Sequence, residues 1–210
     1  MKAAAQMLVM LVAAVAGVQT IRTLKGVDAY NQSFNTSVLV DDTIFGSTGA
    51  LTVSPGSLTI KRNIERSWFQ LKVPAGDVTI QKAIDGASQV LIQSGGNVSI
   101  GDNITGRSWV IIDASGDVSI GKSIAGQSQV WVRAGGFIRL GDGIDGSTVR
   151  LQAGRGITIG KRITNKSTRL EYVSPNITIG SKALQDADLG GATVVAQAFS
   201  LPSFPPNPGP

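Results

Sequence analysis

Three consecutive stretches repeat nearly one pattern: DVTIQKAIDGASQVLIQSGG at 77–96, NVSIGDNITGRSWVIIDASG at 97–116 and DVSIGKSIAGQSQVWVRAGG at 117–136. A repeat of about twenty residues is typical of a solenoid, in which each unit buries its apolar face only against its neighbours. Each unit holds two pairs of apolar residues spaced two apart, such as Val98 with Ile100 and Val110 with Ile112. A period of two indicates strands with one buried face.

The pattern extends to both sides of these units. Its apolar positions stay in register from Ser37, and further units begin at residues 57, 137, 156 and 176. A single isoleucine between the two apolar pairs, such as Ile104, indicates a short third side. We therefore predict an all-β fold, a right-handed parallel β-helix (β-solenoid) with three faces and about eight coils of ~20 residues.

The composition divides the chain into four segments. Residues 1–16 combine Lys2, an apolar run and Ala14-Val15-Ala16, which predicts a secretory signal peptide; a retained anchor or a hydrophobic cap are the alternatives. Residues 17–36 lack a clear period and are predicted to form a leader or N-terminal cap. The solenoid is predicted over residues 37–195. Residues 196–210 form a Pro-rich C-terminal tail, which we expect to be disordered, polyproline-like or a cap, since proline cannot donate to a sheet.

The composition also excludes some chemistries. The chain has no cysteine and no histidine, which excludes disulfides, Cys or His metal sites and catalysis by imidazole. The formal charge of +5 favours anionic partners only weakly. We expect no cofactor, no metal and no catalytic residue, and we do not predict an enzyme.

Two columns of equivalent residues are interpreted as structural. Charges alternate at Lys82, Asp102, Lys122 and Asp142, which predicts a ladder of exposed ion pairs that helps to fix coil register. A serine recurs at one corner of every coil, and its hydroxyl is predicted to bond corner backbone groups. This serine column comprises Ser47, Ser67, Ser88, Ser108, Ser128, Ser147 and Ser167.

Four apolar residues occupy positions where polar ones would be expected. Alternation sends Leu91, Ile111 and Trp131 to the outside of the long strands, with Trp109 beside them. An exposed apolar stripe usually marks an interface, so these four form the predicted interaction face. Two alternatives stay open: the chain's own termini, with Phe199 and Phe204, cover the stripe, or its tryptophans stack on sugar rings.

Basic residues gather toward the C-terminal end of the solenoid. They suggest a site for an anionic polysaccharide, an envelope phosphate or nucleic acid, although a solvated end that discourages unwanted stacking is the favoured interpretation. The residues are Arg150, Arg155, Lys161, Arg162, Lys166 and Arg169.

Units such as GGNVSIGDNITG resemble those of filamentous-haemagglutinin-type adhesins, which are secreted right-handed β-helices. The pattern is also similar to phage tail-spike and bactofilin solenoids. The resemblance covers residues 37 to 185 and implies an exported, non-enzymatic surface protein.

We therefore expect an exported structural or adhesive β-solenoid, secreted or at a bacterial-type cell surface, that associates with itself or another surface protein. Nucleic acid is not an expected partner, and membrane contact is expected only through residues 3–18, if these are retained. The alternatives are a polysaccharide-binding or polysaccharide-cleaving β-helix, and a viral spike or fibre module.

Overall fold

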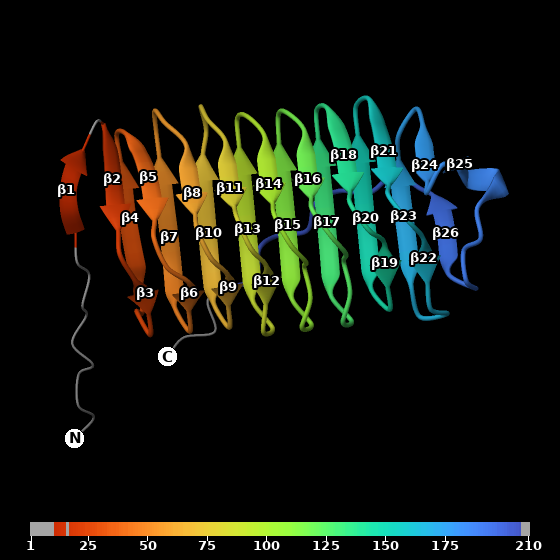
Figure 1. Ribbon diagram of the computed structural model, residues 1–210, viewed down its shortest axis with the longest axis horizontal. Coiled ribbons are helices and arrows are strands. Elements are labelled where there is room, and N and C mark those ends of the chain that lie inside the picture. The colour runs from red at the N-terminus through yellow and green to blue at the C-terminus, as the bar shows by residue number, and fades with distance from the viewer. Residues whose placement is uncertain (1–10, 16, 207–210) are drawn as a thin grey trace, which may run out of the picture.

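The computed structural model describes residues 11–15 and 17–206, and it is a parallel β-solenoid (Figure 1). The predicted all-β fold with three faces is confirmed. Within the described residues the chain makes nine coils rather than eight, because the first coil begins at Val18 and not at Ser37. Equivalent strands of successive coils pair in parallel and in register, so that Val98, for example, lies between Val78 and Val118.

Two continuous sheets and one interrupted side form the three faces. The short-strand sheet comprises β1 (Leu11–Val15), β2 (Val18–Ile21), β5 (Ser37–Val40), β8 (Leu58–Ile60), β11 (Val78–Ile80), β14 (Val98–Ile100), β16 (Val118–Ile120), β18 (Phe137–Leu140), β21 (Gly156–Ile159), β24 (Ile177–Ile179) and β25 (Lys182–Ala183). The long-strand sheet comprises β4 (Tyr30–Phe34), β7 (Thr48–Val53), β10 (Trp68–Val73), β13 (Gln89–Ser94), β15 (Trp109–Ala114), β17 (Gln129–Ala134), β20 (Thr148–Ala153), β23 (Arg169–Val173) and β26 (Thr193–Ala196).

The third side is made of two-residue strands. These are β3 (Leu24–Lys25), β6 (Ile44–Phe45), β9 (Ile64–Glu65) and β12 (Ile84–Asp85), followed by β19 (Ile144–Asp145) and β22 (Ile163–Thr164). Single bridges from Ile84 through Ile104 and Ile124 to Ile144 connect the two groups. The isoleucine that marked a short side in the sequence therefore forms one continuous buried column.

Residues 17–36 form a coil and not the predicted leader. Ile21, Leu24 and Tyr30 fill the same buried positions as the apolar residues of later coils. The sequence hides this coil because β4 carries polar Asn31, Gln32 and Ser33, and Gln32 stands opposite buried Leu51 where later coils have an apolar residue. Most of the predicted signal peptide, residues 1–10 and 16, lies outside the described residues.

Both ends of the short-strand sheet carry a strand of opposite direction. β1 pairs antiparallel with β2 at one end, and β25 pairs antiparallel with β24 at the other, where it leads into a short 3-10 turn at Leu184–Asp186. No helix among the described residues is long and apolar enough to span a membrane.

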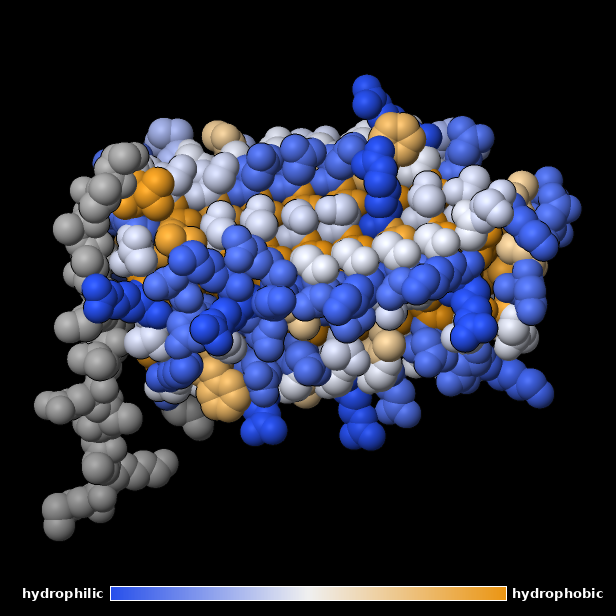
Figure 2. Space-filling model, in the orientation of Figure 1, coloured by the Kyte–Doolittle hydropathy of each residue, from blue (hydrophilic) through white to orange (hydrophobic). Residues whose placement is uncertain are grey.

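The interior consists of stacked Val, Ile and Leu side chains with almost no solvent exposure. The face turned to the viewer in Figure 2 shows bands of hydrophilic side chains along the solenoid axis, with hydrophobic atoms between them. In the three central coils, two successive residues of positive φ turn the chain into the long strand; Gly126 has φ 70° and Gln127 has φ 62°. Two successive residues of positive φ are typical of the central positions of a type I′ β-turn.

One buried glycine lets two aromatic rings enter this narrow core. Gly49 lies between Tyr30 and Phe69 in the same column, and the two rings are 6.4 Å apart, centroid to centroid. A Cβ atom on Gly49 would lie 2.1 Å from the carbonyl oxygen of Tyr30, and the φ of 151° also favours glycine.

We predict that Gly49→Val lowers the free energy of unfolding by about 3 kcal/mol or more, because the added atoms meet backbone that cannot move aside. The measurement is the midpoint of urea unfolding. Thr52→Val, at an outward position of the same strand, is the matched control and should change stability by less than about 0.5 kcal/mol. Equal midpoints for both variants would contradict this account of the core.

Candidate functional site

The outer surface of the long-strand sheet carries the candidate site. Alternation places three outward side chains on each six-residue strand. Parallel register stacks them into three columns, in which neighbouring residues are about 4.8 Å apart. The start column includes Trp68, Gln89, Trp109 and Gln129. The middle column includes Gln70, Leu91, Ile111, Trp131, Arg150 and Glu171. The end column includes Thr52, Lys72, Gln93, Asp113, Arg133, Gln152 and Val173.

The C-terminal tail returns along this surface. After β26 the chain runs back across the sheet without regular secondary structure (Figure 1). Phe204 of this tail lies between two tryptophans of the start column. The ring centroid of Phe204 is 4.7 Å from that of Trp68 and 5.8 Å from that of Trp109. The indole Nε1 of Trp68 donates a hydrogen bond of 3.1 Å to the carbonyl oxygen of Pro205.

These contacts correct the predicted interaction face. Leu91, Trp109, Ile111 and Trp131 do point outward, as alternation requires, but they are not an exposed stripe. Ile111 is 2% exposed and Trp131 is 7% exposed, and Trp109 packs on Trp131 at 5.0 Å as well as on Phe204. The alternative in which a terminus covers the stripe is therefore the one found, and the tail is docked rather than free.

The docked tail leaves one polar atom without a partner. Gln89 stands in the start column between Trp68 and Trp109, at the position that Phe204 covers. Its Oε1 atom is buried and has no hydrogen-bond partner among the described residues. Burying an unpaired amide oxygen costs about 1–3 kcal/mol, which weakens the docking of the tail.

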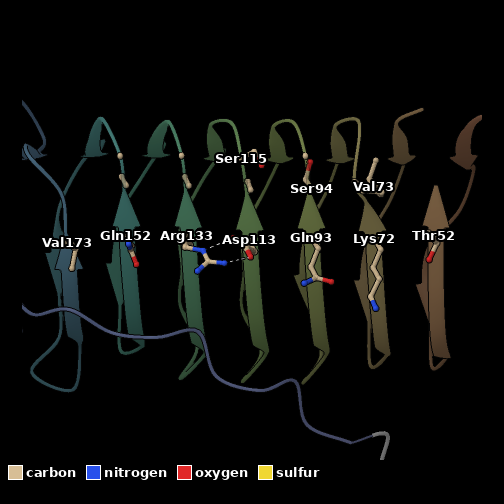
Figure 3. A pocket seen from close by; sticks show the side chains of 17 residues that line it. Thr52, Lys72, Val73, Gln93, Ser94, Asp113, Ser115, Arg133, Gln152 and Val173 are labelled. Carbon is tan, nitrogen blue, oxygen red and sulfur yellow. Dashed lines mark hydrogen bonds and ion pairs between the residues drawn. The ribbon is translucent and has the colours of Figure 1, made fainter. Parts of the chain in front are cut away.

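A groove runs along the end column, beside the tail (Figure 3). It has a volume of about 870 Å³, and its floor presents one outward side chain from each of seven coils. Arg133 binds Asp113 of the preceding coil with both ends of its guanidinium, and the Nε to Oδ1 distance is 2.8 Å. Lys72 forms no ion pair within the described part of the chain, so the groove has a small net positive charge.

The groove is equipped for hydrogen bonding. Lys72 and Gln93 offer donors on two successive coils, and Arg133 and Gln152 do so on two others. Asp113, on the coil between these pairs, is the one carboxylate that lines the groove. Among the described residues no three acidic side chains come together in a way that could hold a metal ion. This groove was not predicted from the sequence; its signal there is the polar residue two places after each of Leu91, Ile111 and Trp131.

The six predicted anion-binding residues do not converge on one site. Arg150 and Arg169 both pair with Glu171 on the long-strand sheet, whereas Arg155 lies over the ring of Phe137. Lys161 pairs with Asp142 at a corner of the coil. Arg162 and Lys166 are exposed and make no ion pair with any described residue.

Glu171 is the most buried charged group on this surface. Its residue is 3% exposed, and it accepts hydrogen bonds from the guanidinium groups of Arg150 and Arg169. The bond from Arg150, joined by that from Arg169, holds the pKa of Glu171 below its usual value, although burial acts in the opposite direction. Arg150 also lies over the ring of Trp131, which connects this cluster to the packed rings of Trp109 and Phe204.

The two structural columns are found where they were predicted, with one correction. Asp102 pairs with Lys122 at 2.7 Å and with Lys82 at 3.9 Å, which matches the ladder of charges. The serine hydroxyls bond corner carbonyls, as Ser108 does with Thr105. Ser167 is exposed, however, and buried Thr168 takes the last position of the column, because a one-residue shift places Thr168 opposite Ser147.

Comparison of the chain with protein-family models, with curated proteins and with solved structures found no match.

We predict that Glu171 makes stability depend on pH. Because its folded pKa is lowered, its contribution is present above the unfolded pKa and is lost as pH falls through the folded value. The Glu171→Gln variant should therefore lose less stability than the wild type between about pH 5 and pH 3. Thermal unfolding across this range is the measurement, with Asp186→Asn in the exposed 3-10 turn as control. Parallel pH profiles for wild type and Glu171→Gln would contradict the assignment.

We also predict that Gln89→Leu stabilises the docked tail by about 1 kcal/mol, since it removes a buried unpaired oxygen and adds apolar contact. Quenching of tryptophan fluorescence by acrylamide, measured against urea concentration, reports the docking. Gln129→Leu is the control, because Gln129 occupies the same column but is exposed. A tail that detaches more readily in Gln89→Leu would refute the prediction.

Proposed function

We propose that this protein is a non-enzymatic binding solenoid that holds an extended polysaccharide in the groove over the end column. The observation that carries the proposal is the row of hydrogen-bonding side chains, one per coil from Thr52 to Gln152, along the solenoid axis (Figure 3). The row runs across the strands, so a ligand that uses it meets a new polar side chain at every coil.

The spacing of the row supports a polymer rather than a small molecule. Equivalent residues repeat about every 4.8 Å, which is close to the length of one sugar unit in an extended chain. Seven coils contribute to the groove, so it extends roughly 29 Å from the first to the last position. Amides and a guanidinium suit sugar hydroxyls, and the free Lys72 favours a chain with some acidic groups.

The arrangement of carboxylates supports binding over cleavage. Most glycoside hydrolases use two carboxylates on either side of the bond that breaks. Here Asp113 is the one carboxylate lining the groove, and both of its oxygens are engaged by Arg133. The proposal is therefore consistent with the prediction, made from the sequence, of a protein that is not an enzyme.

The sequence predicts an exported structural or adhesive protein. We propose that such a protein would adhere by binding a surface polysaccharide in this groove. The apolar face of Leu91, Trp109, Ile111 and Trp131 lies under the tail, so the groove is the surface that supports contact with a partner. Export, cell-surface location and the adhesin resemblance belong to the same proposal.

The test is binding of soluble oligosaccharides, one neutral β-1,4-linked glucan and one uronic acid polymer, measured by isothermal titration calorimetry. We expect Gln93→Ala with Lys72→Ala to weaken binding at least about tenfold, through the loss of two hydrogen-bonding groups. Thr79→Ala, on the outer face of the short-strand sheet, should leave binding unchanged. Equal affinity in the groove variant and the control would overturn the proposal, as would no binding of either polymer.

A further inference from the structure

The tail is held on the long-strand sheet by side chains and not by strand pairing. Trp68 and Trp109 flank the ring of Phe204, and one hydrogen bond joins Trp68 to Pro205. The ladder of the sheet ends with the hydrogen bond from Gln197 N to Tyr172 O. The segment after it can therefore leave the surface without breaking the sheet.

The apolar residues of the tail alternate with exposed ones. Phe199, Leu201 and Phe204 are partly buried, whereas Ser200 and Ser203 are exposed. A Pro-rich segment that places an aromatic ring between two indoles uses the mode in which aromatic grooves bind extended proline peptides. The surface thus has the chemistry of a peptide-binding site, and its occupant is the sequence Leu201-Pro-Ser-Phe-Pro-Pro206.

The segment that connects β26 to Phe204 is barely long enough for the distance it spans. Ala196 ends β26, and Phe204 lies five strands away, at β13, in the sheet order. Five coil spacings along the axis and three residues along the strand separate the two points by about 26 Å. The eight residues from Ala196 to Phe204 reach at most about 26–29 Å. The tail must therefore run nearly fully extended to dock on its own chain.

We infer that the slot between Trp68 and Trp109 is a docking site for the tail of a second copy of this chain, and that two copies exchange tails to form a dimer. Two features favour exchange. The tail makes no strand pairing after Gln197, so it can detach without loss of sheet structure, and its reach on its own chain is taut. Exchange of an identical segment between copies is a low-cost route to a symmetric dimer. The slot is separate from the end-column groove, so this inference does not depend on the proposed polysaccharide.

Deleting Gln197 and Ala198 tests the exchange directly. Six residues reach only about 20–22 Å, so Phe204 can no longer reach the slot of its own chain, whereas a neighbouring copy can still supply it. We expect the shortened protein to dimerise with rising concentration, as measured by light scattering after size-exclusion chromatography. Its tryptophans should be as protected from acrylamide as those of the wild type.

Two control variants make the outcome decisive. Adding Phe204→Ala to the shortened protein should abolish the dimer, and inserting Gly-Ser after Ala198 should give a monomer with a docked tail. A shortened protein that stays monomeric at every concentration, with exposed tryptophans, would overturn the inference. So would a dimer that survives Phe204→Ala.

A peptide of residues 197–206 provides an independent measurement. A variant that ends at Ala196 should bind this peptide saturably, with a change in fluorescence. All three tryptophans of the chain lie at the site, since Trp68 and Trp109 contact Phe204 and Trp131 packs on Trp109. The same peptide with Phe204→Ala should bind about tenfold more weakly, because two aromatic contacts are lost. Absence of saturable binding would overturn the inference, provided that the truncated solenoid keeps the circular dichroism of the full chain.

Discussion

Parallel pairing of each strand with its equivalent one coil away is the constraint on which the rest of this structure depends. It fixes a spacing of about 4.8 Å between equivalent residues and gives every side chain a like neighbour above and below. Inside, this stacks valines and isoleucines into dry columns. Outside, it stacks the residues at one position of the repeat into a column, as the serine hydroxyls and the alternating charges show.

The same stacking explains why one surface carries two different features. The start and middle columns of the long-strand sheet place their aromatic and aliphatic residues together, and the tail covers them with Phe204. Two residues further along each strand, the end column is polar and remains open as a groove. The difference depends on position along the strand alone, since both features use the same coils.

Much of the fold is readable from the sequence because the core repeats. Leu58, Ile84 and Val130 each occupy a position that recurs about every twenty residues, and the predicted three faces follow from that recurrence. The first coil is not apparent in the sequence because Gln32 stands where later coils have an apolar residue, and because Tyr30 fits the core only beside Gly49 of the next coil. Thr168 was missed because it requires a one-residue shift that only strand pairing reveals. The docking of Phe204 on Trp68 could be offered only as one of several alternatives, since no period connects residues 204 and 68.

Because the tail runs nearly straight, its length is coupled to the length of the solenoid. In most repeat proteins these two lengths are independent. A solenoid can gain or lose a coil without disturbing its ladder, because each coil contacts only its neighbours. In this chain an extra coil between β13 and β26 would move Phe204 about 4.8 Å away from its place between the tryptophans. The tail could not span this added distance, because it is already nearly fully extended. One or two residues would have to be added to the tail at the same time. The length of the segment after Ala196 thus sets the number of coils over which the tail can dock on its own chain, although this segment lies outside the repeat.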